Sequence, residues 1–430
     1  MTTEVVVLGG GYVGVWAARR VVGRRGVRVT LVSMAPHHSF HGWTAEVITG
    51  HVAPERARVP LVELVPGARH IHGVVGTVDT SARTVDVMSA TGAQRLRYDH
   101  LVVATGSRDA TDRVPGLTEH GWSLKHDRAL LEMNGNLAGV VEMAARTADP
   151  AHRRRLLHVV VAGAGFAGTE AACAIAQRLR AAVAAESALA GERATVTLLG
   201  AGADVLPSLR PRLEAVAEYA AGKLVEAGVT VRSNARLASV TPTGPVLEDG
   251  TVLAAATVIS ALGQTPVAPP GLEDLATDAA GRLVTDRFLR VAENVWAGGD
   301  CAAVPHPAGS GPCPANALWA IYHGKRIGAN IVRALRGREP APFRFPGLGQ
   351  GASYGIGRGA AELYGVPLTG WVAWLARWVF FHAYMPSRRV ALATLVEWRR
   401  HPALPQVGAQ PWEDRGRAAR PHDRRSTAPR

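Results

Sequence analysis

Cysteine is scarce in this 430-residue chain, and its few copies follow no pattern. Cys173, Cys301 and Cys313 include no Cys-x-x-Cys pair. Their spacing therefore predicts neither a redox-active disulfide nor a metal site. An odd number of cysteines without a framework is typical of proteins in a reducing compartment.

Long apolar runs are also missing. No stretch approaches the roughly 18–20 uninterrupted apolar residues of a membrane-spanning helix. The first expected strand begins at Glu4, which leaves no room for a secretory signal peptide. We therefore expect the protein at the cytoplasmic face of the cell membrane as a peripheral protein, or free in the cytoplasm.

Lysine is the third shortage, because the chain has three lysines and 45 arginines within a formal net charge of +13. Such a bias indicates the base composition of the gene, since net charge bears on association and not on fold. No nucleic-acid partner is predicted. Residues 401–430 are rich in Pro, Arg and Gly without periodicity, and we expect a disordered basic tail there. Such a tail suits an anionic membrane face or is simply a soluble end.

Glycine, by contrast, is abundant, with 47 residues, many of them in turns after apolar strands. A strand from Glu4 to Leu8, a helix from about Tyr12 to Val22 and a strand from Val27 to Val32 form a βαβ unit. The same order recurs at 156–162, 166–182 and 194–199, and another buried strand is expected at 98–104. The repeated unit predicts an α/β fold with two Rossmann-like, doubly wound dinucleotide-binding domains.

Each unit carries a glycine fingerprint between its strand and its helix. The first is Gly9-x-Gly11-x-x-Gly14, and the second is Gly163-x-Gly165-x-x-Gly168. The first glycine permits a tight turn, the second lets a pyrophosphate approach the backbone, and the third lets the helix pack on the strand. The amino end of the helix then faces the phosphate charge. Two fingerprints indicate two dinucleotides, one of which can pass a hydride to the other.

Two further motifs support nucleotide binding. Ala104-Thr105-Gly106 ends one buried strand, and Gly299-Asp300 ends another, where it places a carboxylate beside the start of a helix. Alone, Asp300 would be interpreted as a helix cap. The acid that usually holds the ribose after the second strand is missing from both units, where Ser33 and Gly200 stand instead. The choice between NADH and NADPH stays open, because Gly200 would not repel a 2′-phosphate.

In this order the motifs resemble those of the FAD-dependent pyridine nucleotide oxidoreductases, and within them the type II NADH dehydrogenases, which are non-pumping NADH:quinone oxidoreductases. The resemblance covers about residues 4–398, and its narrower part rests on residues 38–40, 46–50, 351–357, 368–371 and 373–374. It implies FAD in residues 1–118 and 267–340 and NAD(P)H in residues 151–266. Residues 149–155 are expected to be the linker between them.

The resemblance also implies which residues hold each cofactor. FAD is expected at Gly9, Gly11, Tyr12, Val13, Gly14, Ser33, Ala104, Thr105, Gly106, Gly299 and Asp300. NAD(P)H is expected at Gly163, Gly165, Phe166, Gly168, Gly200 and Gly263. Glu170 matches the family's glutamate after the second fingerprint and is expected near the nicotinamide as the catalytic residue. The alternative is an ordinary acid in the first helical turn, where the helix dipole favours it.

The chain departs from the family at the quinone site. The family carries two glutamines four residues apart on the helix after the Gly-Asp motif, and Leu318 and Tyr322 stand at those places. A tyrosine can donate a hydrogen bond to a quinone oxygen, whereas a leucine cannot. The acceptor pocket is therefore expected at Leu318 and Tyr322, with a quinone or a similar carrier as the acceptor. A soluble NAD(P)H:acceptor reductase and a flavin redox sensor without turnover are the alternatives.

Residues 341–400 are expected to form a helical membrane-association module. Within it, Leu368–Met385 carries Trp371, Trp374 and Trp378 on one helical face, with Arg377 inside the segment. Interfacial aromatics with basic residues suit a helix that lies flat in a membrane surface. In that position the tryptophans would enter the membrane and Arg377 would reach the headgroups. The alternative is an internal helix or the interface of a homodimer.

The missing acid at Gly200 leads to a first prediction about the electron donor. We expect weak discrimination between NADH and NADPH, and we expect Gly200→Glu to shift the preference at least several-fold toward NADH, because its carboxylate would repel a 2′-phosphate. The ratio of kcat/KM for the two donors measures the shift. A parent protein that already prefers NADH by several orders of magnitude would contradict the argument.

Overall fold

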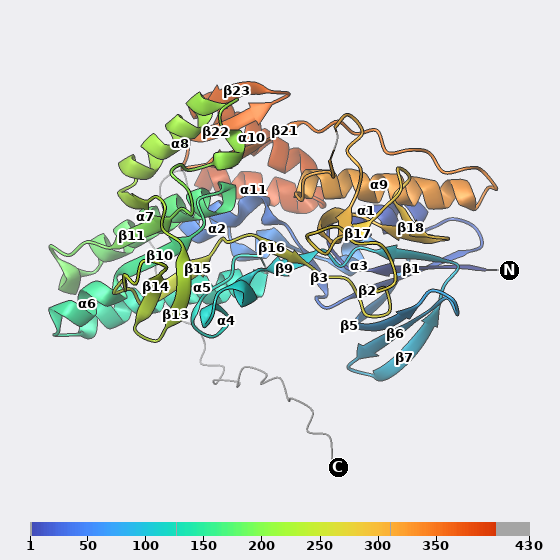
Figure 1. Ribbon diagram of the computed structural model, residues 1–430, viewed down its shortest axis with the longest axis horizontal. Helices are drawn as coiled ribbons and strands as arrows, with labels where there is room; N and C mark the ends of the chain where they lie inside the picture. The colour runs from blue at the N-terminus through green and yellow to red at the C-terminus, as the bar shows by residue number, and fades with distance from the viewer. Residues whose placement is uncertain (1, 126, 310, 401–430) are drawn as a thin grey trace, which may run out of the picture.

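Two sheets with helices packed on them make up most of the computed structural model, which describes residues 2–125, 127–309 and 311–400 (Figure 1). The predicted basic tail, 401–430, lies outside the described residues. The first sheet has eight strands in the order β18-β19-β8-β1-β2-β5-β6-β7. In chain order these strands are β1 (Thr3–Leu8), β2 (Val27–Ser33), β5 (Arg69–Asp79), β6 (Thr84–Ser89), β7 (Gly92–Arg97), β8 (His100–Val103), β18 (Arg290–Ala292) and β19 (Val295–Ala297).

The strand register brings the predicted site motifs of the first sheet together. β1 pairs in parallel with both β2 and β8, so that Leu8 stands opposite Val32 and Val103. β19 continues the parallel part beyond β8, with Ala297 opposite Val103. Because these four strands end at one edge, the segments that follow them meet there. Those segments hold the first fingerprint, Ser33, Ala104–Gly106 and Gly298–Asp300.

Two helices pack against each other beside this sheet, namely α1 (Tyr12–Val21) and α9 (Ala317–Ala334) (Figure 1). A side chain at Gly324 would meet the backbone oxygen of Val13, so this glycine permits their close approach. The remaining short elements of this part are β3 (His37–Ser39), α2 (Thr44–Thr49), β4 (Arg58–Pro60), α3 (Leu61–Leu64), β17 (Leu283–Val284) and β20 (Ala302–Ala303). The short helix α4 (Leu117–His120) packs on the second sheet instead.

The second sheet repeats the doubly wound pattern on a smaller scale. Its four strands are all parallel, in the order β12-β11-β10-β15. The strands are β10 (His158–Ala162), β11 (Thr195–Leu199), β12 (Val229–Arg232) and β15 (Thr257–Ser260), with helices α7 (Phe166–Ala185) and α8 (Glu214–Glu226) and the hairpin β13 (Leu237–Thr241) and β14 (Gly244–Leu247). An antiparallel pair, β9 (Ser107–Asp109) with β16 (Gln264–Pro266), connects the two halves. The prediction of two Rossmann-like units is confirmed, with strand and helix ends within a few residues of those expected.

The segment expected to be the linker, 149–155, is mostly helical, because it forms most of helix α6 (Pro150–Leu156) ahead of β10. Asp149 caps this helix by accepting a hydrogen bond from the Ala151 amide, and Pro150 occupies the first turn, where its missing N–H costs nothing. The basic residues that suggested a linker lie in the last turn, where the helix dipole favours them. A longer helix, α5 (Asp127–Arg146), precedes it.

The C-terminal part is only partly helical, which corrects the expectation for residues 341–400. A three-stranded antiparallel sheet comes first, with β21 (Gly349–Ser353), β22 (Gly359–Leu363) and β23 (Val366–Thr369). Helices α10 (Gly370–Tyr384) and α11 (Arg388–Arg400) follow, so Leu368 belongs to a strand and not to the helix. Within the described part of the chain, no helix has both the length and the apolar character needed to cross a membrane.

Candidate functional site

A pocket of about 590 Å³ lies where the carboxyl edge of the first sheet meets the second half of the molecule. Most of the predicted residues line it, namely Gly9, Gly11, Tyr12, Val13, Ser33, Ala104, Thr105, Gly106, Glu170, Gly263, Gly299 and Asp300. Gly14 lies beneath the glycine turn, against the backbone oxygen of Gly9. The second fingerprint and its neighbours, Gly163, Gly165, Phe166, Gly168 and Gly200, do not line this pocket and lie at the edge of the second sheet instead.

The two glycine turns have the same construction. A Cβ atom at Gly9 would meet the oxygen of Ala104, and one at Gly163 would meet the oxygen of Ala261, so both positions pack against the next strand's turn. A Cβ atom at Gly11 or Gly165 would meet nothing within 4 Å. The second glycine of each turn therefore faces open space, where a phosphate group can approach the backbone.

Two buried histidines hold the turns at the edge of the first sheet. His38 bonds through Nδ1 to the Gly10 oxygen at 3.0 Å, and burial lowers its pKa to about 4. His323 accepts a hydrogen bond from the Gly299 amide at Nδ1, at 3.1 Å, and burial lowers its pKa to about 3. Both rings are therefore neutral at physiological pH, and they position backbone without adding charge to the pocket.

Asp300 has a cationic partner that the sequence did not reveal. The Lys125 ammonium lies 2.6 Å from Asp300 Oδ2, and the Ser107 hydroxyl donates to the same oxygen at 2.7 Å. Burial opposes ionisation of Asp300, yet Lys125 and Ser107 hold its pKa below the ordinary value. Asp109 accepts hydrogen bonds from the Lys125 amide and so fixes this loop. The sequence offered one indication of a special role for Lys125, namely that it is one of only three lysines in an arginine-rich chain.

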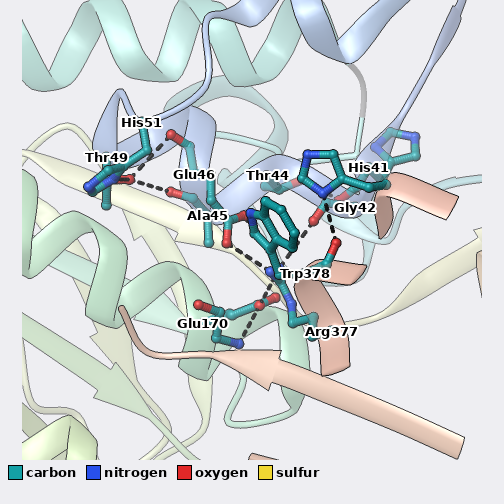
Figure 2. Close-up of polar contacts among 12 residues, drawn as sticks. His41, Gly42, Thr44, Ala45, Glu46, Thr49, His51, Glu170, Arg377 and Trp378 are labelled. Atoms are coloured by element: carbon teal, nitrogen blue, oxygen red, sulfur yellow. Dashed lines mark hydrogen bonds and ion pairs between the residues drawn. The ribbon is translucent and has the colours of Figure 1, made fainter. Parts of the chain in front are cut away.

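Glu170 belongs to a buried charge cluster that also escaped the sequence analysis. The Arg377 guanidinium, on α10, lies 2.7 Å from Glu170 on α7 and 2.7 Å from Glu46 on α2. It also donates to the Gly42 oxygen at 3.1 Å. Figure 2 shows Arg377 reaching between the two carboxylates, with Thr49 and His51 beyond Glu46. Three distant parts of the chain therefore meet at one cation.

The two carboxylates of this cluster face different cavities. Glu170 lines the large pocket, whereas Glu46 lines a small second cavity with Thr49, His51 and Trp374. Burial and, to a smaller extent, the Glu46 charge raise the pKa of Glu170 to about 6, against the opposing effect of the Arg377 charge. The Ser353 amide donates to the same Glu170 oxygen at 2.6 Å. Glu170 can therefore gain or lose a proton near neutral pH at the wall of the pocket.

The position of Arg377 corrects the expected orientation of the tryptophan helix. Arg377 is only 8% exposed and points into the protein, not toward headgroups. Trp374 is 7% exposed, and Trp378 is partly buried against the core, because this face of α10 packs on the rest of the chain. The exposed large apolar side chains of α10 are Trp371, Val372, Leu375 and Val379. The face that could meet a membrane is therefore not the one that the tryptophan spacing indicated.

The expected acceptor residues do not line the large pocket. Leu318 is buried in the first turn of α9. Tyr322 stacks on Phe345, with ring centroids 3.8 Å apart, and its hydroxyl lies 3.2 Å from that of Tyr384. Asn316, Ala317 and Ala320 line the pocket from this helix instead.

Comparisons with known proteins agree with this architecture. A family model described as pyridine nucleotide-disulphide oxidoreductase matches residues 3–324. A type II NADH:quinone oxidoreductase of Mycobacterium tuberculosis is 28% identical over 422 residues, 92% of this chain and 87% of that protein. An NADH dehydrogenase-like protein of the same species is 33% identical over 322 residues, 70% of this chain and 73% of that protein. The structure of NDH2 from Plasmodium falciparum in complex with NADH shares the fold, with a TM-score of 0.84 and 13% identity over 95% of this chain and 100% of that chain.

The charge cluster leads to a prediction about stability. Arg377→Met leaves the buried carboxylates of Glu46 and Glu170 without their cation. We expect this variant to lower the free energy of unfolding, measured with urea, by about 3–5 kcal/mol. Arg389→Met is the matched control, because its ion pair with Glu63 is exposed and contributes about 1 kcal/mol or less. An equal, small loss in both variants would contradict the assigned role of the cluster.

The pH dependence of the Arg377→Met deficit has a definite sign. The Arg377 charge lowers the pKa of Glu170, so its removal raises that pKa beyond about 6, further above the ordinary value of 4.5. A carboxyl with a raised pKa in the folded state binds protons more readily there than in the unfolded chain. The contribution of Glu170 to the free energy of unfolding is therefore most favourable at acid pH and is lost as pH rises through 6. The stability lost in Arg377→Met should grow over that range. Adding Glu46→Gln should recover part of this loss, because it removes one of the two unpaired carboxylates.

Proposed function

This chain belongs to the type II NADH:quinone oxidoreductases, within the pyridine nucleotide-disulphide oxidoreductases, and on that premise we propose that it oxidises NADH and passes the electrons through FAD to a quinone. The observation that carries the proposal is the large pocket, into which the nucleotide-binding edge of the first sheet and the helix after the second fingerprint both project. Such a meeting point is what hydride transfer between two dinucleotides needs, because donor and acceptor must be held in contact.

The edge of the first sheet fits FAD. The open space at Gly11 admits a pyrophosphate against the backbone, and the Ser33 hydroxyl at the end of β2 can bond a ribose. Within the described residues, the hydrogen bonds that Ser107 and Lys125 donate to Asp300 both use Oδ2, so Oδ1 faces the pocket as an acceptor for a hydroxylated chain. We assign FAD to residues 1–118 and 267–340 on these grounds. FAD bound there would supply the hydride acceptor for the reduced nicotinamide and the carrier that passes the electrons on to the quinone.

The edge of the second sheet, in residues 151–266, fits the nicotinamide donor. Gly165 leaves the same open space at the start of α7 that Gly11 leaves at α1. Gly163 and Gly168 tolerate no side chain, since Gly168 lies against the Gly163 oxygen. A substitution at Gly168 would break the unit itself, so Gly165 is the position where a side chain would block only the ligand. Gly263 extends this donor site into the shared pocket, which Glu170 also lines.

Glu170 lies where it can supply a proton to the second half-reaction, the reduction of the quinone. Reduction of a quinone by NADH consumes one proton beyond the hydride, because the quinol carries two hydrogens. A group with a pKa of about 6 at the pocket wall can take up a proton near that pH and release it to the acceptor. Arg377 and the Ser353 amide hold the carboxylate in place and stabilise its ionised form.

The proposed function is tested by flavin spectra under anaerobic conditions. The purified protein should show a flavin spectrum that NADH bleaches and a short-chain quinone restores. Bleaching without restoration by any quinone would overturn the acceptor, and the absence of flavin would overturn the whole assignment.

Glu170→Gln separates the two half-reactions in that experiment. We expect bleaching by NADH at the parental rate and restoration by quinone slowed by roughly 10²–10⁴, the usual contribution of a positioned acid or base. In the parent the restoration rate should fall as pH rises through about 6, as Glu170 loses its proton, and the variant should show no such inflection. Glu142→Gln, an exposed carboxylate on α5, is the matched control.

The exposed side of the C-terminal helices supports peripheral attachment to a membrane. Val372, Leu375 and Val379 recur along one face of α10, and Leu392 and Val396 along one face of α11, all exposed. Apolar side chains gathered on helices in this way bind membrane surfaces by burying area among the lipid chains. Quinones with long tails are lipid-phase molecules, so attachment there would bring the pocket to its acceptor.

Point substitutions test this attachment better than removal of the module. Removal would also delete Arg377 and leave Glu46 and Glu170 without their cation. We expect Leu375→Glu/Val379→Glu to weaken sedimentation with phosphatidylcholine vesicles by roughly tenfold or more, because charge opposes insertion among lipids. Bleaching by NADH should not change. Val225→Glu/Val252→Glu, at exposed apolar positions of the second half, is the control. Equal binding of both double variants would show that α10 is not the contact.

A further inference from the structure

A second hollow, of about 780 Å³, opens beside the C-terminal helices and away from the large pocket. Its walls come from α1, α3, α9 and the segment that joins α10 to α11. Four cationic side chains line it, namely Arg19, Lys325, Arg388 and Arg389. Glu63 is the one acidic residue among its lining residues, and it pairs with Arg389. The hollow therefore carries an excess of positive charge.

Two of these cations have no carboxylate partner among the described residues. Lys325 is exposed, and its ammonium lies over the rings of Tyr322 and Tyr384 at 4.5 and 5.8 Å from their centroids. Arg388 is exposed at the start of α11. Ring faces favour a cation without neutralising it, so both charges remain available to a ligand.

Arg19 makes the floor of the hollow rigid. Its guanidinium donates to the Leu64 oxygen at 2.7 Å and to the Pro386 oxygen at 2.9 Å. These two hydrogen bonds join α1 to α3 and to the turn that precedes Arg388. They hold the Arg19 guanidinium in a fixed position in the hollow. Trp16 and Tyr384 add apolar walls on either side.

The apolar face of the C-terminal helices leads into this hollow. Along α10 the exposed positions Val372, Leu375 and Val379 are followed one turn later by Ala383, which lines the hollow. Along α11 the lining residue Arg388 is followed at one-turn steps by Leu392 and Val396. Cations at the end of an apolar strip match the shape of a lipid, whose phosphate is joined to hydrocarbon chains.

We propose that this hollow binds the phosphodiester headgroup of an anionic phospholipid, with Lys325 and Arg388 as the principal contacts. The proposal rests on the membrane attachment proposed above and adds a specific site to it. It places the headgroup between the α10–α11 turn and α9, with the lipid chains along the exposed faces of both helices. The site would make attachment depend on anionic lipid and would orient the protein on the membrane.

The test uses full-length holoprotein and vesicles of phosphatidylcholine with and without phosphatidylglycerol, at constant ionic strength. The parent should prefer vesicles with phosphatidylglycerol. Lys325→Gln/Arg388→Gln should lose this preference by roughly thirtyfold, given the usual contribution of two basic side chains at a membrane surface. Its binding to pure phosphatidylcholine and its bleaching by NADH should match the parent.

Arg24→Gln/Arg25→Gln is the control, because it removes the same charge from an exposed turn elsewhere. A preference that survives in the Lys325/Arg388 variant, or that falls equally in the control, would overturn the site. Binding to both vesicle types without preference overturns the headgroup site alone, whereas binding to neither also overturns the membrane attachment. A melting temperature raised by inorganic phosphate in the parent only, without any lipid preference, would mean that the hollow takes free phosphate and not lipid.

Discussion

The Arg377 guanidinium is the contact on which the other parts of this structure depend. It joins α10 to α2 and to α7, and so connects the C-terminal module to both nucleotide-binding halves at one buried point. Burying a charge is costly unless partners satisfy it, and here two carboxylates and the Gly42 oxygen do so. Because two acids share one cation, the cluster is left with an excess negative charge, and burial raises the pKa of Glu170 accordingly. The interaction that assembles the fold therefore also sets the protonation of the group at the pocket wall.

The rest of the pocket is built mainly from backbone. Parallel strands in register end together, and the turns that leave them present amide groups and open space at Gly11 and Gly165. Neutral histidines, held neutral by burial, fix two of these turns. The main charges there are Asp300, balanced by Lys125, and Glu170, balanced by Arg377. A pocket of this kind can bind large anionic cofactors through fixed dipoles, while each of these two acids still lies beside a cation of the protein.

Helix α10 has two apolar sides with different tasks. Trp374 and Arg377 face inward, where Trp374 lines the small cavity beside Glu46 and Arg377 holds the charge cluster. Val372, Leu375 and Val379 face outward. A helix that is apolar nearly all round belongs either inside a protein or between a protein and lipid. The inner face of α10 contacts α2 and α7, and these contacts hold the helix in place. A membrane surface attached to its outer face would therefore have a fixed position relative to the electron-transfer pocket.

The sequence by itself determined the two βαβ units, their glycine turns and the placement of Asp300 after a buried strand. These features are local, because the periodicity of strands and helices and the conformation of glycine turns depend on residues close together in the sequence. The partners of the charged groups were decided only by the tertiary structure. Lys125 lies 175 residues from Asp300, and Arg377 lies 331 residues from Glu46. The same holds for the inner face of α10, where tryptophan spacing shows that the side chains share a face but not whether protein or lipid covers it. Helical period fixes which residues stand together, whereas packing against distant elements chooses which side is buried.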